Sequence, residues 1–404
     1  MRDMKHTDRN RKILHLDLDA FFCAVEEKLD PNLKGKPFAV GGSPEGRGVV
    51  ASCSYSARQF GIKSAMPMRL ALRKFPKLLV VHSHYRAYVG SSQQVMRILR
   101  NFTPLVEQIS IDEAFLDITD LLQPAFEIAK NVQAKIEDEL SLPCSIGIAT
   151  NKLVAKIATN IGKSRNSGIT APKAIVEVPP GEEQLFLAPL PVNEMWGIGP
   201  KASAKLHQLG IHTIGDIVNT PEAILIKEFG KFGMDLVRHA HGRDDRQVSD
   251  EHEIKSVSNE VTFSRDVVDE KELVSTIRNL SIKVGKSLRK NKLSGHTIRL
   301  KIRWPNFETH TRQISLREPT DQDSIIIKSA LHIFFEIWQE GKKVRLLGVG
   351  VDHLTQPVQQ LSLLDGSYEK ENRLLEAVDD LHRRYGDKII HRGTEIQSKN
   401  GREI

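Results

Sequence analysis

The sequence holds few of the residues that build disulfide frameworks or zinc sites. Its 404 residues include three cysteines, which lie far apart and form no CxxC or Cys/His cluster: Cys23, Cys53 and Cys144. This pattern argues against a disulfide scaffold or a zinc centre and suits a reducing compartment. The chain also lacks an apolar run of about 18 residues, and the segment MRDMKHTDRNRK lacks the apolar core of a signal peptide. We therefore expect a cytoplasmic protein with no membrane partner.

Positive charge is concentrated in one region, although the overall composition is ordinary at 40% hydrophobic and 27% charged residues. The whole chain has a formal net charge of +7 and a pI near 9.1. Between Lys255 and Arg312, 13 Lys and Arg residues stand against 6 Asp and Glu residues. This region alone therefore carries an excess as large as that of the whole chain, as a polyanion-binding surface would.

The length of the chain and its alternating patterns predict several domains, the first of them α/β. A single core stops growing near roughly 250–300 residues, and this chain is longer. Strand and helix patterns alternate up to about residue 162, which indicates an α/β domain of βαβ-type units. We predict a strand over 13–22, a strand and then a helix over 49–60, a strand over 109–118, a helix around 124–140, a strand over 144–149 and a helix over 151–162.

The character of the sequence changes after Pro179-Pro180-Gly181. Residues 182–240 read as several short helices, and residues 241–253 contain one aliphatic side chain, Val248, which predicts a linker. Residues 254–353 return to mixed strands and helices. The tail beyond Thr355 is polar, and its last part predicts a helix over 370–385 for which the sequence suggests no role; the helical spacing is that of Leu374, Val378, Leu381 and Tyr385.

Two apolar segments carry adjacent or alternating acids. In HLDLDAFF, Asp17 and Asp19 share one face of a strand, and in QISIDEAFLDIT the pair Asp112-Glu113 sits among apolar residues. Carboxylates in such surroundings are costly unless a cation neutralises them. Oxygen ligands without His or Cys favour Mg²⁺ or Mn²⁺ over zinc, and a pair of such ions is the apparatus for in-line displacement at phosphorus. For either motif alone, solvent-facing acids on a sheet or in a turn remain the alternative.

Two segments have the features of phosphate-binding elements. In SCSYSARQFG, Ser54 can cap a helix that presents Tyr55 and Arg58 on one face. A helix start with an arginine and a tyrosine hydroxyl is a suitable anion site. In NKLVAKIATNIGK, one stripe of a helix carries three lysines: Lys152, Lys156 and Lys163. Each pattern taken alone is equally typical of a solvated helix face.

Two further segments suggest contacts to a DNA backbone. In MWGIGPKASAKLHQLGI, Gly197 and Gly199 precede a helix that includes Lys201, which fits a helix-hairpin-helix whose backbone N–H groups approach a phosphate. The alternative is a tight turn between helices. In TIRLKIRW, apolar residues alternate with Arg299, Lys301 and Arg303. A basic strand face suits a duplex backbone, and an ordinary solvated sheet face is the alternative.

Five motifs together resemble one known family. HLDLDAFFCAVE, SYSARQFGIKSAMP, SIDEAFLD, SIGIATNKLVAKIA and WGIGPKASAKL occur in the order and approximate spacing of the Y-family DNA polymerases of the DinB type. The resemblance covers about residues 12–355. It implies a multidomain α/β right-hand polymerase: a βαβ-type palm (12–20 and 84–170), small fingers (21–83), a helical thumb with a helix-hairpin-helix (171–242), a linker (243–252) and a C-terminal α+β little finger (253–355).

The resemblance also implies roles for single residues. Asp17, Asp112 and Glu113 match the metal-binding carboxylates, with the Leu18 carbonyl completing one ion's shell, whereas Asp19 belongs to the motif without being a ligand. Phe22 matches the steric gate that excludes the ribose 2′-OH. The nucleotide-binding positions are Phe21, Phe22, Ser52, Tyr55, Arg58 and Lys163. The turn GKSRNSG is longer than the family's usual turn after Lys163, which puts that lysine's reach in question.

The polar tail, residues 356–404, contains a short apolar motif at 360–364. QLSLL resembles the bacterial sliding-clamp-binding peptide, with a final leucine where phenylalanine is usual: Gln360, Leu361, Leu363 and Leu364. A simple docking segment would show the same pattern. The resemblance therefore implies the sliding clamp as a partner of an otherwise monomeric protein.

These expectations converge on a template-directed DNA polymerase that uses two Mg²⁺ ions, with Mn²⁺ as a substitute. Low fidelity and the bypass of damaged template bases are what the resemblance implies. The partners of such a polymerase would be primer–template DNA and dNTPs. Two other classes of protein remain open. A nucleotidyl cyclase can use a similar two-carboxylate domain but has no use for a helix-hairpin-helix or a basic C-terminal domain. A DNA-binding scaffold would keep those features and dispense with the acids.

Overall fold

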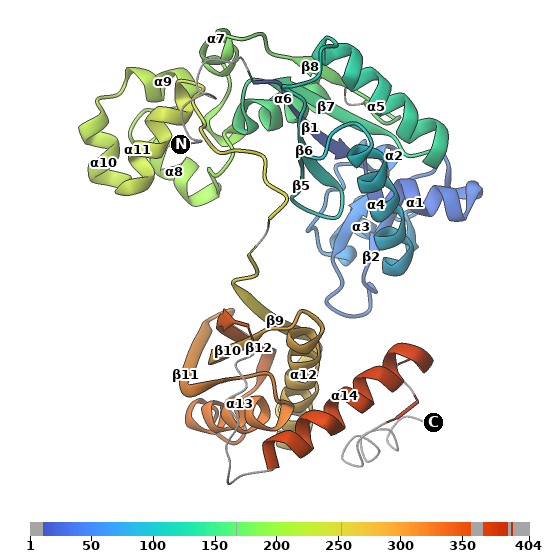
Figure 1. Ribbon diagram of the computed structural model, residues 1–404, viewed down its shortest axis with the longest axis vertical. Coiled ribbons are helices and arrows are strands. Elements are labelled where there is room, and N and C mark those ends of the chain that lie inside the picture. Colours follow the sequence, from blue (N-terminus) through green and yellow to red (C-terminus); the bar gives the residue numbers. More distant parts are fainter. Residues whose placement is uncertain (1–10, 167, 252, 357–366, 387–388, 391–404) are drawn as a thin grey trace. The chain divides into compact units, whose positions relative to one another are not determined.

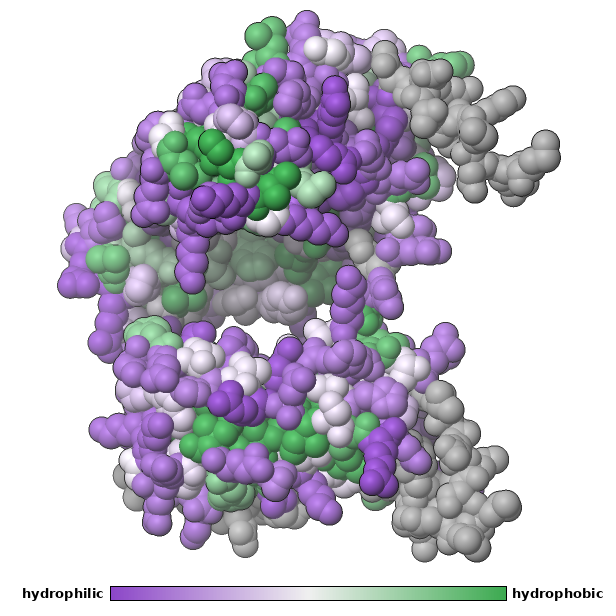
Figure 2. Space-filling model, turned by 90° about the vertical axis from the view of Figure 1, so that its left-hand side faces the viewer, coloured by the Kyte–Doolittle hydropathy of each residue, from purple (hydrophilic) through white to green (hydrophobic). Residues whose placement is uncertain are grey.

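The structure is a computed structural model that describes residues 11–166, 168–251, 253–356, 367–386 and 389–390 (Figure 1). The chain folds into two compact units, unit 1 up to His252 and unit 2 from Glu253. Each unit has its own buried core. Figure 2 shows a face on which hydrophilic residues predominate and hydrophobic residues gather in a few patches. Among the described residues, no helix has the length and apolar character needed to span a bilayer.

Unit 1 is built around a five-stranded sheet of order β5-β6-β1-β7-β8. The central strand β1 runs antiparallel to both of its neighbours, β6 and β7. Within this sheet only β7 and β8 are parallel, joined through a helix, so its strand pairing is mainly antiparallel where the sequence predicts βαβ-type units. The strands are β1 (Ile13–Leu18), β5 (Val106–Gln108), β6 (Glu113–Asp117), β7 (Cys144–Ala149) and β8 (Ile175–Glu177).

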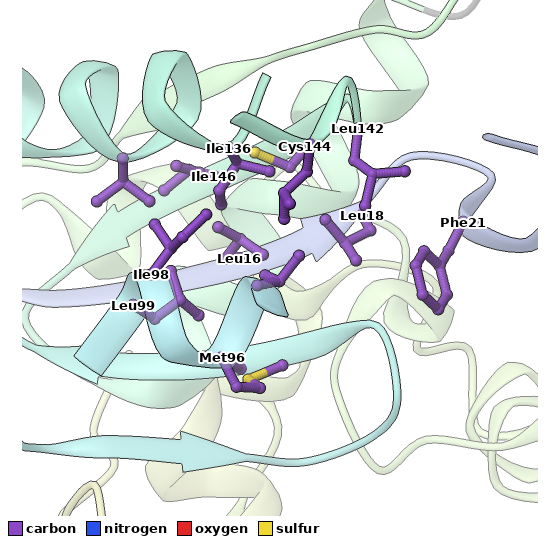
Figure 3. Packing of buried hydrophobic residues seen from close by; sticks show 14 of the residues in the cluster. Leu16, Leu18, Phe21, Met96, Ile98, Leu99, Ile136, Leu142, Cys144 and Ile146 are labelled. Carbon is purple, nitrogen blue, oxygen red and sulfur yellow. The ribbon is translucent and has the colours of Figure 1, made fainter. Parts of the chain in front are cut away.

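Helices cover both faces of this sheet. Leu14, Leu16 and Leu18 face α4 (Tyr85–Arg100) and α5 (Ala125–Leu140), and they join a cluster of buried hydrophobic side chains (Figure 3). The opposite face, which includes Ile13 and Phe115, packs against α6 (Lys152–Arg165). The predicted division of β1 into an apolar face and an acidic face is therefore confirmed, but α6 covers the acidic face.

The first predicted strand is shorter than expected. The strand β1 ends at Leu18, Ala20 adopts a left-handed conformation with φ 44°, and α1 (Phe21–Leu29) begins at once. The sequence pattern suggests that the strand continues to Phe22, but Phe21 and Phe22 are the first two residues of α1. The acid pair is divided in a similar way, since β6 begins at Glu113 and Asp112 lies in the preceding turn.

The segment after α1 forms a smaller three-stranded sheet of order β3-β2-β4 with its own core. Its strands are β2 (Phe38–Gly41), β3 (Val50–Cys53) and β4 (Leu79–Val81), and its helices are α2 (Tyr55–Arg58) and α3 (Met68–Lys74). As predicted, Ser54 caps α2 by accepting a hydrogen bond from the Ala57 N–H at 3.2 Å, and the following turn ends at Gly61 with φ +69°.

The last part of unit 1 is helical, as the sequence predicts. The helices are α7 (Glu183–Leu187), α8 (Pro200–Gln208), α9 (Ile214–Asn219), α10 (Glu222–Phe229) and α11 (Lys231–Ala240). Leu206, Ile214 and Leu225 are fully buried in the core that they share with α6. A Thr213–Asp216 capping box fixes the start of α9.

Residues 243–249, here called the strap, are held on unit 1, although the sequence predicts a linker from residue 243. Asp244, 6% exposed, accepts a hydrogen bond from the Leu153 N–H at 3.1 Å, and Val248 is also 6% exposed. Lys152 donates to the Gln247 carbonyl at 3.2 Å, and the Ser249 N–H donates to Glu107 at 3.1 Å. A polar composition predicts little apolar burial, but it does not exclude hydrogen bonds to a neighbouring element.

Unit 2 is an antiparallel sheet of order β11-β10-β12-β9 packed on two helices. The predicted alternation of β10 is confirmed: Ile298, Leu300 and Ile302 are fully buried, whereas the basic residues between them are half-buried. The elements are β9 (Ser256–Val267), α12 (Glu270–Lys290), β10 (Ser294–Arg303), β11 (Thr309–Thr320), α13 (Asp323–Ile337) and β12 (Val344–Thr355).

The tail helix α14 (Ser367–Tyr385) is attached to unit 2. Arg289 of α12 donates to Asp379 of α14 at 2.7 Å and to Asp323 of α13 at 2.9 Å. Leu375 is 3% exposed. The helix that the sequence predicts without a role is thus anchored to the C-terminal unit by an arginine shared between three helices.

Candidate active site

Two of the three candidate carboxylates face each other across neighbouring strands. Asp17 of β1 and Glu113 of β6 are register partners in the antiparallel pair. Asp112 lies one residue before β6, and its carbonyl accepts the Leu18 N–H at 3.0 Å, which ties the turn to the end of β1. The Ser110 hydroxyl donates to the Asp112 carboxylate at 2.5 Å and accepts from the Glu113 N–H at 3.0 Å. The three acids therefore lie at one end of the sheet: Asp17 on β1, Glu113 at the start of β6, and Asp112 in the turn that Ser110 stabilises.

Lysines of α6 approach these acids from the covering helix. Lys163 contacts Asp17 directly and lies 3.1 Å from Asp19. Lys156 donates to Glu113 at 2.6 Å, and Lys152 pairs with Glu107 at 2.6 Å. The predicted lysine stripe exists, but each of its members is paired with a carboxylate, so it is neither a solvated helix face nor a row of free cations.

Asp19 is separated from the other acids. Its side chain is buried, accepts from the Ser145 hydroxyl at 2.9 Å and accepts from the Lys173 N–H at 3.0 Å. These bonds point its carboxylate toward β7 and away from Glu113. Asp19 therefore links the end of β1 to β7 and to Lys163 of α6.

A histidine that the sequence patterns do not single out completes the site. His15 is fully buried, and its Nδ1 lies 2.9 Å from the Thr159 hydroxyl, which itself donates to the His15 carbonyl at 3.0 Å. This arrangement leaves Nε2 facing the Lys156 ammonium group at 3.4 Å. Burial lowers the pKa of His15 to about 4, so the imidazole is neutral near pH 7. Only its position on the Asp17 face of β1 could have identified it.

Burial and charge act in opposite directions on the carboxylates. Burial, partly offset by Lys163, raises the pKa of Asp17 to about 7. Burial alone would also raise the pKa of Glu113, but the ammonium group of Lys156, 2.6 Å away, lowers it below its ordinary value. Burial opposes the charge of Lys163, yet Asp17 and Asp19 raise the pKa of its ammonium group. The site thus holds negative charge that depends on nearby cations.

The donor set fits a divalent cation. Asp17, Asp112 and Glu113 supply only hard oxygen ligands, which suit Mg²⁺ or Mn²⁺. Ammonium groups already lie against two of these carboxylates, so the site attracts cations. Within the described residues, no group of three or more His, Cys, Asp or Glu side chains is gathered as a ready-made metal site. An ion here would therefore have to draw the three carboxylates together and displace the lysines.

The candidate triphosphate residues lie on the smaller sheet and α2. Ser52 is 9% exposed, and Tyr55 is 8% exposed. Arg58 is exposed, with its guanidinium carbon 4.5 Å from the centre of the Tyr55 ring. Burial and the charges of Asp19 and Asp17 raise the pKa of Tyr55, so its hydroxyl keeps its proton near pH 7. Of the predicted nucleotide residues, Lys163 alone contacts the carboxylates directly.

The candidate gate residue is part of an aromatic group. Phe22, in the first turn of α1, stacks on Tyr88 of α4, with ring centroids 4.3 Å apart and planes 13° apart. Phe21 is buried, and its ring meets Tyr88 edge-on at 6.3 Å. Tyr88 has no counterpart in the sequence predictions, because a tyrosine inside an amphipathic helix is indistinguishable from any core residue.

The candidate DNA-binding residues lie at exposed or half-buried positions. Gly197, with φ +99°, and Gly199 are exposed on the loop before α8, and Lys201 is exposed in its first turn. On β10, Arg299 pairs with Asp352 at 3.1 Å and Lys301 with Glu260 at 2.7 Å. Arg303 donates to the Thr309 hydroxyl at 2.8 Å. The candidate clamp peptide, Gln360 to Leu364, lies outside the described residues.

Comparison with known proteins covers most of the chain. Residues 16–160 match the impB/mucB/samB family, residues 254–363 match the C-terminal domain of that family, and residues 180–211 match the IMS family HHH motif. DNA polymerase IV 1 of Bacillus subtilis (strain 168) is 37% identical over 403 residues, which are 98% of this chain and 95% of that protein. DNA polymerase IV of Streptococcus agalactiae is 39% identical over 353 residues, or 86% and 95% of the two chains.

Solved structures show the same fold. A Y-family DNA polymerase chimera superposes with a TM-score of 0.74 at 24% identity and covers 86% of this chain and 100% of its own. The insertion ternary complex of Dbh DNA polymerase gives a TM-score of 0.61 at 25% identity with the same coverage. The chain therefore belongs to the impB/mucB/samB family and is a low-fidelity, translesion DNA-directed DNA polymerase with the right-hand Y-family fold.

Proposed function

We propose that Asp17, Asp112 and Glu113, with the Leu18 carbonyl, hold two Mg²⁺ ions that serve template-directed nucleotidyl transfer. The observation that carries this proposal is the register pairing of Asp17 with Glu113 beside Asp112, with lysine ammonium groups against two of the acids. Membership of the family implies dependence on a divalent metal ion. The hard oxygen donors favour Mg²⁺ as that ion, with Mn²⁺ as a substitute.

The chain's own residues position the reactants. When bound, the ions would lower the pKa of the primer 3′-OH and balance the charge of the triphosphate. Lys163, once displaced from Asp17, is free to contact a phosphate oxygen. Arg58 and Tyr55 present a guanidinium group and a hydroxyl from α2, and Ser52 lies on the adjacent strand β3. No side-chain nucleophile is needed, because the primer hydroxyl attacks directly and catalysis rests on positioning and electrostatics.

We propose the remaining assignments on the basis of the resemblance to the family. Phe22 acts as the steric gate against the ribose 2′-OH, with Phe21 beside the sugar. The palm comprises 12–20 and 84–170, the fingers 21–83, the thumb 171–242 and the little finger 253–355. The exposed turn at Gly197 and Gly199 with Lys201, and the basic face of β10, contact primer–template DNA. Residues 360–364 bind the sliding clamp, and the protein acts as a cytoplasmic monomer.

A primer-extension assay tests the proposal directly. Extension of an undamaged primer–template with all four dNTPs is expected with Mg²⁺ or Mn²⁺ and not with chelator. Adding one dNTP at a time should extend the primer only where the template base is complementary. A folded protein that binds the DNA but extends no primer with any divalent ion would overturn the proposal and favour a DNA-binding scaffold.

Divalent metal binding is expected to strengthen as pH rises toward 7 and then to level off. The folded pKa of Asp17 lies near 7, above its ordinary value of 3.8, so its proton competes with the ion below pH 7. Each pH unit below 7 should weaken binding up to about tenfold. Because the folded pKa of Asp17 is raised, protonation of this carboxylate also stabilises the metal-free protein. That stabilisation is present below pH 4 and is lost as pH rises through 7.

Calorimetric titration of metal-free protein with Mn²⁺ at pH 6, 7 and 8 measures this dependence. The Asp17→Asn variant has no such proton, so its weaker binding should vary less over the same range. Equal affinity for Mn²⁺ at all three values in the wild-type protein would contradict the expectation and place the ion away from Asp17.

A further inference from the structure

The ring of Phe22 is supported by a buried tyrosine. Tyr88 is fully buried in α4 and offers its ring face to Phe22 at 4.3 Å with a 13° angle between the planes. A gate that rejects one hydroxyl group must be held within a fraction of an ångström. The position of Phe22 therefore depends on the position of the Tyr88 ring.

The hydroxyl of Tyr88 is fixed by two hydrogen bonds of opposite sense. It accepts the backbone N–H of His84 at 3.1 Å and donates its own proton to Glu26 of α1. Burial and the contact with Glu26 raise the pKa of Tyr88 to about 12, so the phenol keeps this proton near pH 7. The tyrosine ring is thus anchored at its hydroxyl end by a carboxylate.

That carboxylate is an unusual group to bury at this place. Glu26 is 2% exposed and lies one helical turn after Phe22, on the same face of α1. Within the described part of the chain, its basic partner is His84, whose Nδ1 lies 3.0 Å from both of its oxygens. A buried carboxylate is costly, and an apolar side chain would hold two helices together at least as well. The presence of Glu26 therefore suggests that the Tyr88 ring must be held in one position, in addition to any contribution to stability.

We propose that Glu26 is a positioning residue for sugar discrimination, which acts through Tyr88 to hold the ring of Phe22. This inference rests on the proposed role of Phe22 as the gate. Glu26 affects the position of Phe22 in two ways. It lies on α1, the helix that carries Phe22, and it holds Tyr88 of α4, whose ring supports Phe22. Loss of its carboxylate leaves the phenol without its acceptor, and the Tyr88 ring and the Phe22 ring then shift together.

Single-nucleotide insertion measures the effect. The kcat/KM values for a dNTP and for the matching rNTP opposite the same template base give a discrimination ratio. Phe22→Val, which removes the ring, should lower this ratio roughly a hundredfold. Glu26→Met, similar in size but without an acceptor, should lower it about tenfold, roughly the effect of losing one buried charge-assisted hydrogen bond. The change should fall mainly on the KM for the rNTP.

Three further variants sharpen the test. Glu26→Gln keeps an acceptor oxygen and should restore most of the ratio. Tyr88→Phe removes only the hydroxyl and should act like Glu26→Met, which keeps the test valid if Glu26→Met folds poorly. Glu27→Met changes the neighbouring, half-buried carboxylate of α1 and should leave the ratio unchanged. In the double variant Phe22→Val/Glu26→Met, the ratio should equal that of Phe22→Val alone.

The outcomes separate this inference from the proposed gate. If Phe22→Val leaves the ratio unchanged, Phe22 is not the gate and both statements fail. If Phe22→Val lowers the ratio while Glu26→Met and Tyr88→Phe change only the melting temperature, Glu26 is a structural link between α1 and α4, and this inference alone is overturned.

Discussion

Primer extension by an Asp112→Ala variant is expected to fall by about a thousandfold or more, while its affinity for primer–template DNA is retained. Asp112 lies in the turn before β6, where its carbonyl bonds to Leu18 and its carboxylate bonds to Ser110. The substitution removes only the carboxylate, because the backbone bond to Leu18 does not depend on the side chain. The fold should therefore persist, and the loss should fall on the metal-dependent step.

Two variants make this result specific. Asp112→Asn keeps the shape of the side chain and should be almost as inactive, since a neutral amide is a poor ligand for a hard cation. Asp138→Asn changes an exposed acid on α5 and should leave extension unchanged. Extension by Asp112→Ala within about tenfold of wild type would remove this carboxylate from the site, because the loss of a metal ligand is expected to cost far more.

The second large effect is expected from Gly147→Ala. A Cβ at this position of β7 would lie 2.0 Å from the Ala155 carbonyl oxygen, 2.6 Å from the Thr159 nitrogen and 2.7 Å from the Thr159 hydroxyl. Two of these atoms belong to the backbone of α6, so the helix itself must move. Overpacking of this kind should destabilise unit 1 by roughly 3 kcal/mol, a fall in melting temperature of about 6–12 °C.

The same displacement should reduce activity, because α6 carries Lys156 and Lys163. Thermal unfolding and primer extension of one preparation measure both effects. Gly90→Ala is the matched control: Gly90 lies inside α4 with no atom within 4 Å of the added Cβ. It should stabilise that helix slightly. A Gly147→Ala protein with wild-type melting temperature would show that α6 can shift outward at little energetic cost.

The sequence predicts well those parts of the fold in which apolar residues recur with one clear period. The alternation of β10 predicts its buried and basic faces, because a residue in a strand can face only two ways. The helices from 182 to 240 are similarly predictable from apolar spacing. The acids are predictable because carboxylates among apolar residues are rare, and Asp17 and Glu113 do meet across two strands.

The parts that the sequence does not predict depend on contacts between distant elements. Nothing in the helical pattern of α6 distinguishes a solvated lysine from one that meets a buried acid, so the pairing of Lys156 with Glu113 emerges only in three dimensions. Likewise, His15 and Tyr88 occupy ordinary core positions in their patterns. The antiparallel pairing of β1 is missed because alternation of strands and helices does not determine strand direction.

The attachment of the strap has a consequence for the strength of DNA binding. With residues 243–249 fixed on unit 1, only residues 250–255 remain before β9 begins at Ser256. If one duplex is bound by both units, as proposed above, the second unit samples that duplex at an effective concentration that reaches the millimolar range for a short tether. Even a weak contact by the basic face of β10 would then lengthen the residence time of the whole polymerase on its primer.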